Sequence, residues 1–540
     1  MADEHILLKG SRRFHRGGVE ILGHADSHEW CEVTVKLRRK SPIPEPSTSG
    51  SPVLTKKALL GGHGADPNDV KKVEDVFKRY GLTVVDRNDP AASIRFGGSA
   101  EDMERVFAVH LFKARHEGRT YRARTGDIHI PKELDGIVVG VFGLDNRRMT
   151  RHRRQGSKKS ITSSASGKSR PWFFSGELAS FYKFPANDGA GQTVGIIELD
   201  GEFLPDDLKK FGEIAGLRQL PKVDVINVET IDPTSQSFQD ASVEVMLDVE
   251  TVAGACPGSD IVMYFSNFTE QGWVEAIDSA VHDSAHELAS ISVSFGLAEG
   301  ADIWTEQAME SVNDSLKVAA TLGIPVCIAS GDDGSDDQVG DGGAHVDFPA
   351  SSPFVLAVGG TTLIRKAGSF TEVAWKEGDG LRQDGGGSTG GGVSVVFPRP
   401  DWQTVDITSV NPRAPKGRCI PDVSADAAES SGYRMVVFGK KITEGGTSAA
   451  APLWAAFIAR LSAAGKNVGY LTPQLYQANP KTSGQTLGKV CCNDITKGNN
   501  ATAAAGGYFA GEGYDAVTGW GSPNGESFLR FLSRSKGARE

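Results

Sequence analysis

Cysteine is scarce in this 540-residue chain, and its spacing excludes the common cysteine-based sites. The six cysteines include no CxxC pair and no Cys/His spacing typical of structural zinc, and the sequence leaves open whether any of them form disulfides. No run of about 18 apolar residues is present, so we expect no transmembrane helix. The first 20 residues are polar and charged, and they lack the apolar core of a standard secretory signal peptide.

Histidine is also sparse in the larger, C-terminal part of the chain. Residues 171–540 contain only His282, His286 and His345, and none of them lies in a His-Gly-Thr motif. A Ser-His-Asp triad of the subtilisin kind is therefore not supported. His282 and His286 have the spacing of metal ligands, but no third ligand is evident, and we expect them on a surface helix instead.

Charge is distributed unevenly along the chain. Residues 1–170 carry 32 lysine and arginine residues against 21 acidic ones, a net charge of +11, and the remainder carries 26 against 47, a net charge of −21. Nucleic-acid binding is the usual interpretation of a basic segment, but a basic part joined to an acidic part favours attraction between the two. We therefore predict that the basic third docks on the acidic two-thirds, and that the chain binds neither nucleic acid nor membrane.

The chain is too long for one ordinary hydrophobic core, and its first two segments differ in pattern. Residues 1–148 indicate strands and helices in the order β-α-β-β-α-β, which predicts a small α+β domain of the split βαβ kind. Asp66-Pro67 begins one of its helices and Ser99 caps the other. Residues 149–170 contain seven basic residues and no acidic one, which indicates a solvated, protease-accessible linker.

Short apolar runs dominate residues 171–540, and helical stretches separate several of them. Continuous apolar strands alternating with helices predict an α/β fold, in which a doubly wound parallel sheet is covered on both faces. In such sheets the functional residues lie at the carboxyl ends of the strands. The expected strands cover residues 193–199, 260–265, 291–296, 324–331, 354–360 and 433–439, and the expected helices cover 240–253 and 305–322.

The sharpest local motif is Gly-Gly-Thr-Ser-Ala-Ala-Ala-Pro, which spans residues 445–452 and precedes an apolar helical run. The glycines permit close approach of another molecule, and Ser448 would be presented to it at a helix N-terminus. Ser448 could equally be a plain N-cap, because a nucleophilic serine also needs a base.

Carboxylates could supply that base. Glu244 and Asp248 lie four residues apart on one face of a helix that is otherwise apolar, so they interrupt a buried surface rather than a solvated one. In a cleft, two such groups can share a proton, which raises the pKa of one of them. Glu250 points elsewhere, and we expect it to be solvated. Asp332 follows a buried strand beside glycines, where a turn-forming Asp is the alternative interpretation.

Together, the motifs GGTSAAAP, EVMLD, SGDDG and DITKGNN…GEGYDAVTGWGSP resemble those of the sedolisins, or serine-carboxyl peptidases, and most of all the kumamolisin branch. The resemblance spans nearly the whole chain. It implies an inhibitory prodomain (1–148), a linker that holds the activation cleavage (149–170) and a subtilisin-like peptidase domain (171–540).

The resemblance also implies a role for each acid. Ser448 becomes the nucleophile, Glu244 its general base and Asp248 the carboxylate that orients Glu244. Asp332 takes the oxyanion-hole role, for which it must be protonated, and this explains why the family works in acid. Glu198 matches a glutamate that extends the catalytic hydrogen-bond chain.

Two further positions follow from the same resemblance. Where the kumamolisin pattern has a tryptophan after a strand-end serine, this chain has Phe295, which carries no N–H donor. Asp347, in HVDFPAS, matches an aspartate near the S1 pocket, where a buried acid would favour a basic P1 residue. As a bare sequence feature, Asp347 could equally be a structural acid.

The C-terminal motif implies one Ca²⁺ site. The matching positions supply the carboxylates of Asp494 and Asp515 and the backbone carbonyls of Ile495, Gly511 and Gly513. Calcium prefers six or more oxygen ligands, which such a loop can supply.

The sequence thus predicts an acid-acting serine endopeptidase that is made as a monomeric zymogen and cleaves protein or peptide substrates. The resemblance implies an extracellular enzyme whose own prodomain is its intramolecular inhibitor. Two alternatives stay open. One is a tripeptidyl-peptidase of the same family, and the other is a non-catalytic binding protein on the same scaffold, against which the joint presence of Ser448, Glu244, Asp248 and Asp332 speaks.

Overall fold

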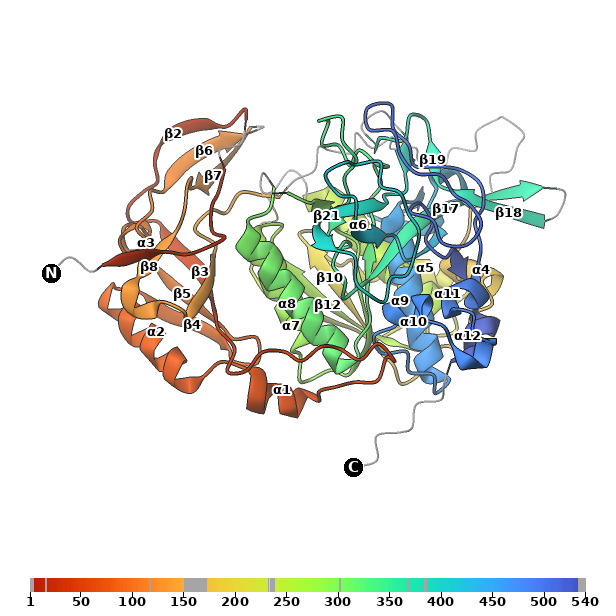
Figure 1. The fold of residues 1–540 in the computed structure, drawn as a ribbon, viewed down its shortest axis with the longest axis horizontal. Helices are drawn as coiled ribbons and strands as arrows, with labels where there is room; N and C mark the ends of the chain where they lie inside the picture. The colour runs from red at the N-terminus through yellow and green to blue at the C-terminus, as the bar shows by residue number, and fades with distance from the viewer. Residues whose placement is uncertain are drawn as a thin grey trace.

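A computed structural model describes most of the chain (Figure 1). The described residues are 4–149 apart from 15, 16 and 117, and 172–532 apart from 232, 234–237, 301–302, 367–368 and 383–385. The predicted linker therefore lies outside the described residues, except for Met149, and the activation cleavage within it stays a prediction. Met149 itself is buried at 4% exposure, against residues of the C-terminal part.

The N-terminal domain is built around a four-stranded antiparallel sheet with the order β4-β5-β3-β9. Helices α2 and α3 pack on it through an apolar core, in which the Phe77 ring stands edge-on to those of Phe96 and Phe107. The predicted β-α-β-β-α-β order is confirmed. The elements are β3 (Trp30–Leu37), α2 (Pro67–Arg79), β4 (Thr83–Asn88), β5 (Ser93–Ser99), α3 (Ala100–Phe107) and β9 (Val138–Phe142).

The predicted caps of both helices are present. The Asp66 carboxylate accepts a hydrogen bond from the Asn68 backbone N–H, and Ser99 Oγ accepts one from the Asp102 backbone N–H. The domain also carries elements that the sequence analysis did not predict. They are β1 (His5–Leu7), β8 (His129–Pro131), α1 (Lys56–His63) and a three-stranded sheet of β2 (Glu20–His24), β6 (Phe112–His116) and β7 (Arg119–Ala123).

The C-terminal domain contains the predicted doubly wound sheet. Its strand order is β11-β12-β10-β13-β15-β17-β18, with β23 also paired to β17, and every pair is parallel except β17 with β18. The strands are β10 (Thr193–Leu199), β11 (Val223–Asn227), β12 (Asp260–Ser266), β13 (Leu288–Val293), β15 (Val326–Ala329), β17 (Leu356–Lys366), β18 (Ser369–Ala374) and β23 (Val423–Asp426).

One predicted strand is wrongly placed. Residues 433–439 contribute β24 (Tyr433–Val437), which leaves the parallel sheet and pairs antiparallel with β25 (Lys440–Glu444). The reason is a tight turn at Phe438-Gly439, where both residues have positive φ values, 49° and 69°, that reverse the chain into a hairpin. The short strand β23 pairs with β17 instead, which the sequence analysis did not predict.

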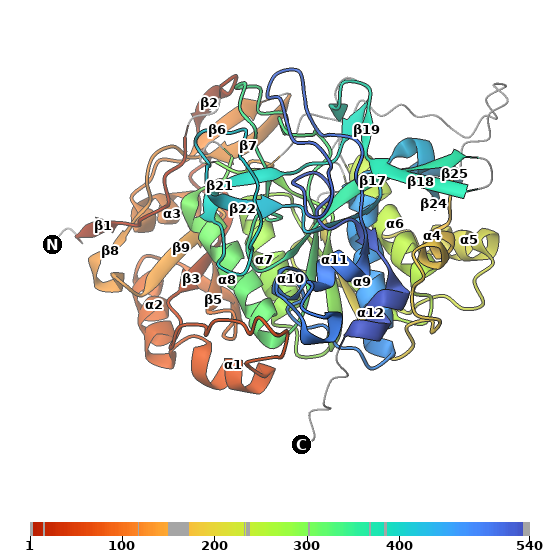
Figure 2. The same cartoon turned by 45° about the vertical axis from the view of Figure 1, so that its right-hand side comes forward.

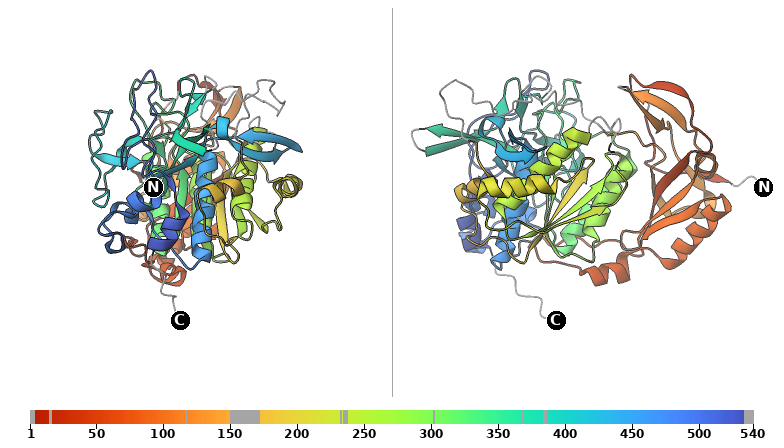
Figure 3. Two further views of the ribbon diagram at one scale, coloured as in Figure 1. Left: turned by 90° about the vertical axis from the view of Figure 1, so that its right-hand side faces the viewer. Right: turned by 180° about the vertical axis from the view of Figure 1, so that it is seen from behind.

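Helices cover both faces of the sheet, as Figure 3 shows. The side chain of Ile196 in β10 joins the core under one helix pair, and that of its neighbour Ile197 joins the core under the other, as the alternation of a strand requires. One face carries α6 (Phe238–Ala255) and α9 (Thr447–Ala463), and the other carries α7 (Glu270–Val281) and α8 (Glu306–Leu322).

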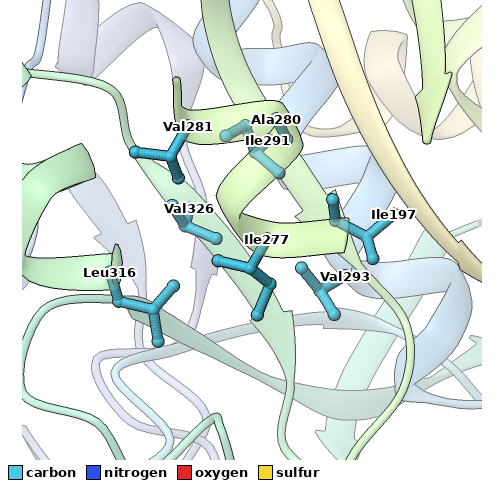
Figure 4. Close-up of a pocket in the computed structure, with 8 residues that line it drawn as sticks. All are labelled: Ile197, Ile277, Ala280, Val281, Ile291, Val293, Leu316 and Val326. Carbon is cyan, nitrogen blue, oxygen red and sulfur yellow. The ribbon is translucent and has the colours of Figure 1, made fainter. Parts of the chain in front are cut away.

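Figure 4 shows the α7/α8 side of the sheet, where side chains of Ile277 and Leu316 meet those of the strands. The figure centres on a small pocket between these helices and the sheet. All eight residues that line the pocket are apolar, so it forms part of the core and has no polar group that could bind or react with a substrate. Further helices of the domain are α4 (Ser175–Phe181), α5 (Pro205–Ala215), α10 (Thr472–Tyr476), α11 (Leu487–Cys491) and α12 (Gly525–Phe531).

The N-terminal domain docks on helices α7 and α8 (Figure 2). Lys36 Nζ lies 2.7 Å from Asp278 Oδ2 and Arg13 Nη1 lies 2.6 Å from Glu270 Oε1, and all four side chains are buried. The Gln307 side chain adds two hydrogen bonds to the backbone of the edge strand β9. The charge distribution therefore predicted the docking correctly: basic residues of the small domain meet acidic residues of the large one.

All six cysteines are free thiols, and five of them are buried. Within the described ranges, no helix combines the length and the apolar character that a membrane span needs.

Candidate active site

The candidate residues come together at the carboxyl edge of the parallel sheet. Glu198 is near the end of β10, Ser294 follows β13 directly, and Asp332 follows β15. Ser448 lies in the first turn of α9, which starts above the same edge, and α6 contributes Glu244 and Asp248. Side-chain contacts link four of these elements, as described below.

Two features of the GGTSAAAP motif hold Ser448 in place. Gly446 has a φ of 112°, and a Cβ atom there would lie 2.9 Å from Asp332 Oδ2, so only glycine fits. Pro452 has no N–H, which leaves the Ser448 carbonyl without its helical partner. Ser294 Oγ donates a hydrogen bond to that carbonyl at 3.0 Å, and the Ser448 hydroxyl donates to the Ser294 carbonyl at 3.2 Å.

Ser294 connects this serine to the buried carboxylate of Asp248. Its Oγ also lies 2.8 Å from Asp248 Oδ1, so one hydroxyl faces two acceptors. A hydroxyl has one proton to donate, so both contacts are full hydrogen bonds when Asp248 carries a proton and donates it to Ser294 Oγ. Consistent with this, burial and the charge of Glu244 raise the pKa of Asp248 well above its ordinary value.

Three carboxyl groups interact at this place. Glu198 is fully buried, and neither of its carboxylate oxygens has a hydrogen-bond partner among the described residues. Burial raises the pKa of Glu198 far above the ordinary range, and the charges of Asp248 and Glu244 raise it further. Glu244 is less buried than the other two and belongs to the same cluster. Such a group of acids shares protons among its members at neutral pH.

Asp332 is fixed against the residue that precedes the candidate nucleophile. Its Oδ1 accepts hydrogen bonds from Thr447 N at 2.8 Å and from Thr447 Oγ1 at 2.7 Å. Its Oδ2 faces Arg382 Nη1 at 3.3 Å, and the same guanidinium pairs with Asp333 at 2.7 Å. Both oxygens of Asp332 are acceptors here, so donating a hydrogen bond would require Asp332 to gain a proton.

Neither Arg382 nor a role for Ser294 was apparent from the sequence. No motif marks Arg382, which lies in a glycine-rich loop far along the chain from Asp332. Ser294 follows a strand that was predicted, and its position at the strand end is the signal that could have indicated a role.

Asp347 and Phe295 lie near the segment that follows Ser294. Asp347 is buried in the short strand β16 (Asp347–Phe348), which pairs with β14 (Leu297–Ala298), and its carboxylate lies against Gly296. The Phe295 ring packs edge-on against Phe268 at 5.7 Å. Both residues therefore border the segment that carries Ser294.

Two further sequence expectations are wrong. Glu250 is buried, not solvated, because α6 packs against the β24 hairpin, where Val436 N donates to Glu250 Oε2 at 2.8 Å. The pair of histidines does not lie on a surface helix, because α7 ends at Val281. His282 follows as its cap, and His286 lies in the turn beyond, 2.6 Å from Asp283 Oδ2.

The C-terminal loop brings the two predicted calcium carboxylates to one segment. Gly513 N donates to Asp494 Oδ2 at 2.9 Å, and Gly511 N donates to Asp515 Oδ2 at 3.0 Å. Ile495 follows Asp494 and is buried. Burial raises the pKa of Asp515 to about 6, so its negative charge is not fully compensated by these contacts. An all-oxygen set with uncompensated charge fits a hard cation such as Ca²⁺.

Comparisons with known proteins relate both parts of the chain to peptidase families. The family described as Pro-kumamolisin, activation domain, matches residues 45–147, and the subtilase family matches residues 234–508. Kumamolisin from a Bacillus species is 37% identical over 494 residues, covering 89% of this chain and 86% of that protein. Tripeptidyl-peptidase sed5 from Aspergillus fumigatus is 29% identical, covering 98% and 97% of the two chains.

A solved structure adds three-dimensional support. Sedolisin from Pseudomonas, a serine-carboxyl proteinase in complex with two molecules of pseudo-iodotyrostatin, aligns with a TM-score of 0.57 and 29% identity. The alignment covers 67% of this chain and 98% of the other. With an activation domain followed by a subtilase-like domain, and with relatives along nearly its whole length, the chain belongs to the sedolisin family of serine-carboxyl peptidases.

Proposed function

We propose that this protein is an acid-acting serine endopeptidase, made as a zymogen and active outside the cell as a monomer. The observation that carries the proposal is the linkage at the sheet edge. Ser448 contacts Ser294, Ser294 contacts Asp248, and Asp248 interacts with Glu244 and Glu198 within one buried cluster. A serine beside a proton-sharing group of carboxyls has the parts that nucleophilic catalysis needs.

In the proposed reaction, the Ser448 hydroxyl turns from the Ser294 carbonyl toward Glu244. Ser448 Oγ attacks the scissile carbonyl while Glu244 takes its proton, and Glu244 then returns that proton to the leaving amine. Water then hydrolyses the acyl-enzyme, while Glu244 takes the proton of the water and returns it to Ser448 Oγ. Asp248 keeps Glu244 in place, and its own position is held by the Ser294 hydroxyl.

Asp332 is the proposed donor to the oxyanion that forms. It lies beside Thr447, so a protonated Asp332 can reach a carbonyl bound at Ser448. An ionised Asp332 would repel the oxyanion, which gives the reaction its requirement for acid. Arg382 balances the negative charge of Asp332 and Asp333 while the enzyme is at rest.

We also propose one Ca²⁺ ion in the C-terminal loop. The carboxylates of Asp494 and Asp515 would bind it, together with the backbone carbonyls of Ile495, Gly511 and Gly513. The ion would compensate the buried charge of Asp515 and fix the loop, so its contribution is structural.

A second candidate activity is tripeptidyl cleavage, favoured by the similarity to the Aspergillus fumigatus tripeptidyl-peptidase over nearly the whole length. An internally quenched peptide with a blocked N-terminus separates the two activities. An endopeptidase cleaves it at acid pH, whereas a tripeptidyl-peptidase requires the free amine and cleaves only the unblocked peptide.

The same assay tests the nucleophile. Ser448→Ala should abolish cleavage and leave a folded chain that remains at full length in acid, because it can no longer process itself. Ser180→Ala, an exposed serine on α4, is the matched control and should be as active as the wild type. Cleavage by Ser448→Ala at acid pH would show that another group is the nucleophile.

A further inference from the structure

Asp200 carries a buried carboxylate next to the candidate active site. It lies two residues beyond Glu198, just after β10, and is 3% exposed. Its φ of 72° is left-handed, and its backbone N–H donates to the Ser266 carbonyl at 2.8 Å, which fixes the turn. The carboxylate forms an ion pair with Arg148, which immediately precedes the predicted linker.

Other acids at the domain interface have partners that remain when the N-terminal domain leaves. Glu270 also accepts hydrogen bonds from Thr305, and Asp278 also accepts one from Ser315, and both partners belong to the peptidase domain. Among the described residues, the Asp200 side chain has an ionic or hydrogen-bonding contact with Arg148 alone. Release of the N-terminal domain would therefore leave this carboxylate without its cation and open to another one.

The ion pair lies between two elements that carry residues of the candidate site. Gly201 packs so closely against the first turn of α6 that a Cβ atom would lie 2.7 Å from its backbone, one turn before Glu244. On the other side, Met149 N donates to the Phe268 carbonyl at 2.8 Å, and the Phe268 ring contacts Phe295, next to Ser294. Arg148 thus lies between α6, which carries Glu244, and the segment that carries Ser294.

We propose that Asp200 determines specificity by binding an arginine or lysine side chain of the substrate, in the place that Arg148 takes in the zymogen. This inference rests on the peptidase function proposed above. The guanidinium of Arg148 already shows that a planar cation fits the carboxylate. The carboxylate is distinct from that of Asp347, which lies against Gly296 in the pairing of β14 with β16.

The test uses the full-length chain after activation in acid and a set of blocked, internally quenched peptides. One arginine is moved through the four positions on each side of the cleaved bond, and each peptide is compared with its glutamine counterpart. At one position, arginine should raise kcat/KM by about 10-fold or more over glutamine, as expected for a charge pair in a desolvated site. Asp200→Asn should remove this preference and leave kcat/KM for the glutamine peptide within about 2-fold of the wild type.

Two further variants separate specificity from general damage. Asp200→Glu keeps the charge and should restore part of the preference, and Glu202→Gln removes an exposed charge from the same loop and should retain all of it. If Asp200→Asn does not fold, competition replaces it. Blocked arginine amide should inhibit wild-type cleavage of the glutamine peptide, and blocked citrulline amide, its neutral isostere, should not.

The outcomes distinguish this inference from the proposed function. If the peptides are cleaved but no position prefers arginine, or if the preference survives Asp200→Asn, the Asp200 subsite is wrong and the peptidase function stands. Equal inhibition by the arginine and citrulline amides contradicts the subsite in the same way. If no peptide is cleaved, the proposed function fails and the subsite fails with it.

Discussion

Ser294 illustrates how much chemistry depends on a single hydroxyl proton. Its Oγ lies within hydrogen-bonding distance of both Asp248 Oδ1 and the Ser448 carbonyl, and that carbonyl is available because Pro452 cannot bond to it. The arrangement is fully satisfied when Asp248 is protonated, in line with the raised pKa of Asp248. The proton on Asp248 therefore couples the carboxyl cluster to the helix that carries Ser448.

This coupling predicts that Glu244 and Asp248 act as a unit. Glu244→Gln and Asp248→Asn should each lower kcat by roughly 10³-fold or more, and the double variant should be little worse than either single one. Steady-state kinetics on a quenched peptide at acid pH measures this. Losses that multiply in the double variant would indicate independent roles and contradict the shared mechanism.

Glu250 gives a separate prediction for stability. Burial raises the pKa of Glu250 to about 9, whereas an unfolded chain has the ordinary value of about 4.3. Between these pH values the folded state keeps a proton that the unfolded state loses. The contribution of Glu250 to the free energy of unfolding is therefore fully present below about pH 4 and is lost as the pH rises to about 9. Glu250→Gln should remove this loss, because the amide is neutral and can still accept from Val436 N.

Thermal unfolding across pH checks the Glu250 prediction. The variant should match the wild type near pH 4 and become more stable at higher pH, by up to a few kcal/mol at pH 8. Glu213→Gln, an exposed glutamate on α5, should show no such trend. A Glu250→Gln difference that does not change with pH would mean that the buried carboxyl is ionised in the folded protein.

At the scale of elements, α6 and α9 serve both the core and the site. Both are apolar on nearly all sides and pack against each other on one face of the sheet, so their polar residues have little freedom to move. The C-terminal loop combines the packing of Tyr514 against Tyr476 and Trp520 with backbone hydrogen bonds to Asp494 and Asp515. A bound cation would add to these contacts by compensating the charge of the two carboxylates.

The calcium proposal predicts a loss of stability when the loop carboxylates change. Asp494→Asn and Asp515→Asn should each lower the melting temperature in calcium, and EDTA should do the same to the wild type. Calcium at 100 times its Kd stabilises the native state by about 2.7 kcal/mol. Glu512→Gln, an exposed acid in the same loop, is the matched control and should leave the response to EDTA intact. A melting temperature that is insensitive to EDTA would remove the ion from the proposal.

At the scale of the whole molecule, the basic N-terminal domain and the acidic C-terminal domain meet in an interface that contains buried ion pairs. The buried pairs Lys36–Asp278 and Arg13–Glu270 join the domains. Acid protonates carboxylates and leaves lysine and arginine charged, so the attraction should weaken as the pH falls. Glu275 opposes this trend: burial raises its pKa to about 7, so it takes up a proton readily in the docked state. The release of the N-terminal domain in acid must therefore come from the weakening of the other ion pairs, Lys36–Asp278 and Arg13–Glu270.

The Lys36–Asp278 pair supplies the test. Lys36→Ala leaves Asp278 buried without its cation, which costs about 3–5 kcal/mol for a buried pair. The full-length variant should therefore release its N-terminal domain and begin to cleave a quenched peptide at a less acid pH than the wild type. Lys71→Ala, an exposed lysine on α2, should not shift that pH. An unchanged onset for Lys36→Ala, or an onset that does not respond to salt, would mean that apolar contacts hold the domains together.

The sequence by itself determined the elements whose signals are local. The β10 strand runs over the predicted residues 193–199, and the caps at Asp66 and Ser99 start helices where they were expected, because alternation and capping depend on neighbours along the chain. The motifs also indicated Ser448, Glu244, Asp248 and Asp332, and the fold brings these residues to one edge of the sheet.

Only the tertiary structure decided which distant groups those residues meet. The 433–437 run looks like another parallel strand, yet a turn with positive φ values folds it into a hairpin, and that hairpin buries Glu250. The partners Arg382 and Arg148 come from far along the chain and carry no local pattern. A sequence pattern gives the period and the ends of an element, whereas the burial of a polar side chain such as Glu250 and the identity of its partner depend on how distant segments pack.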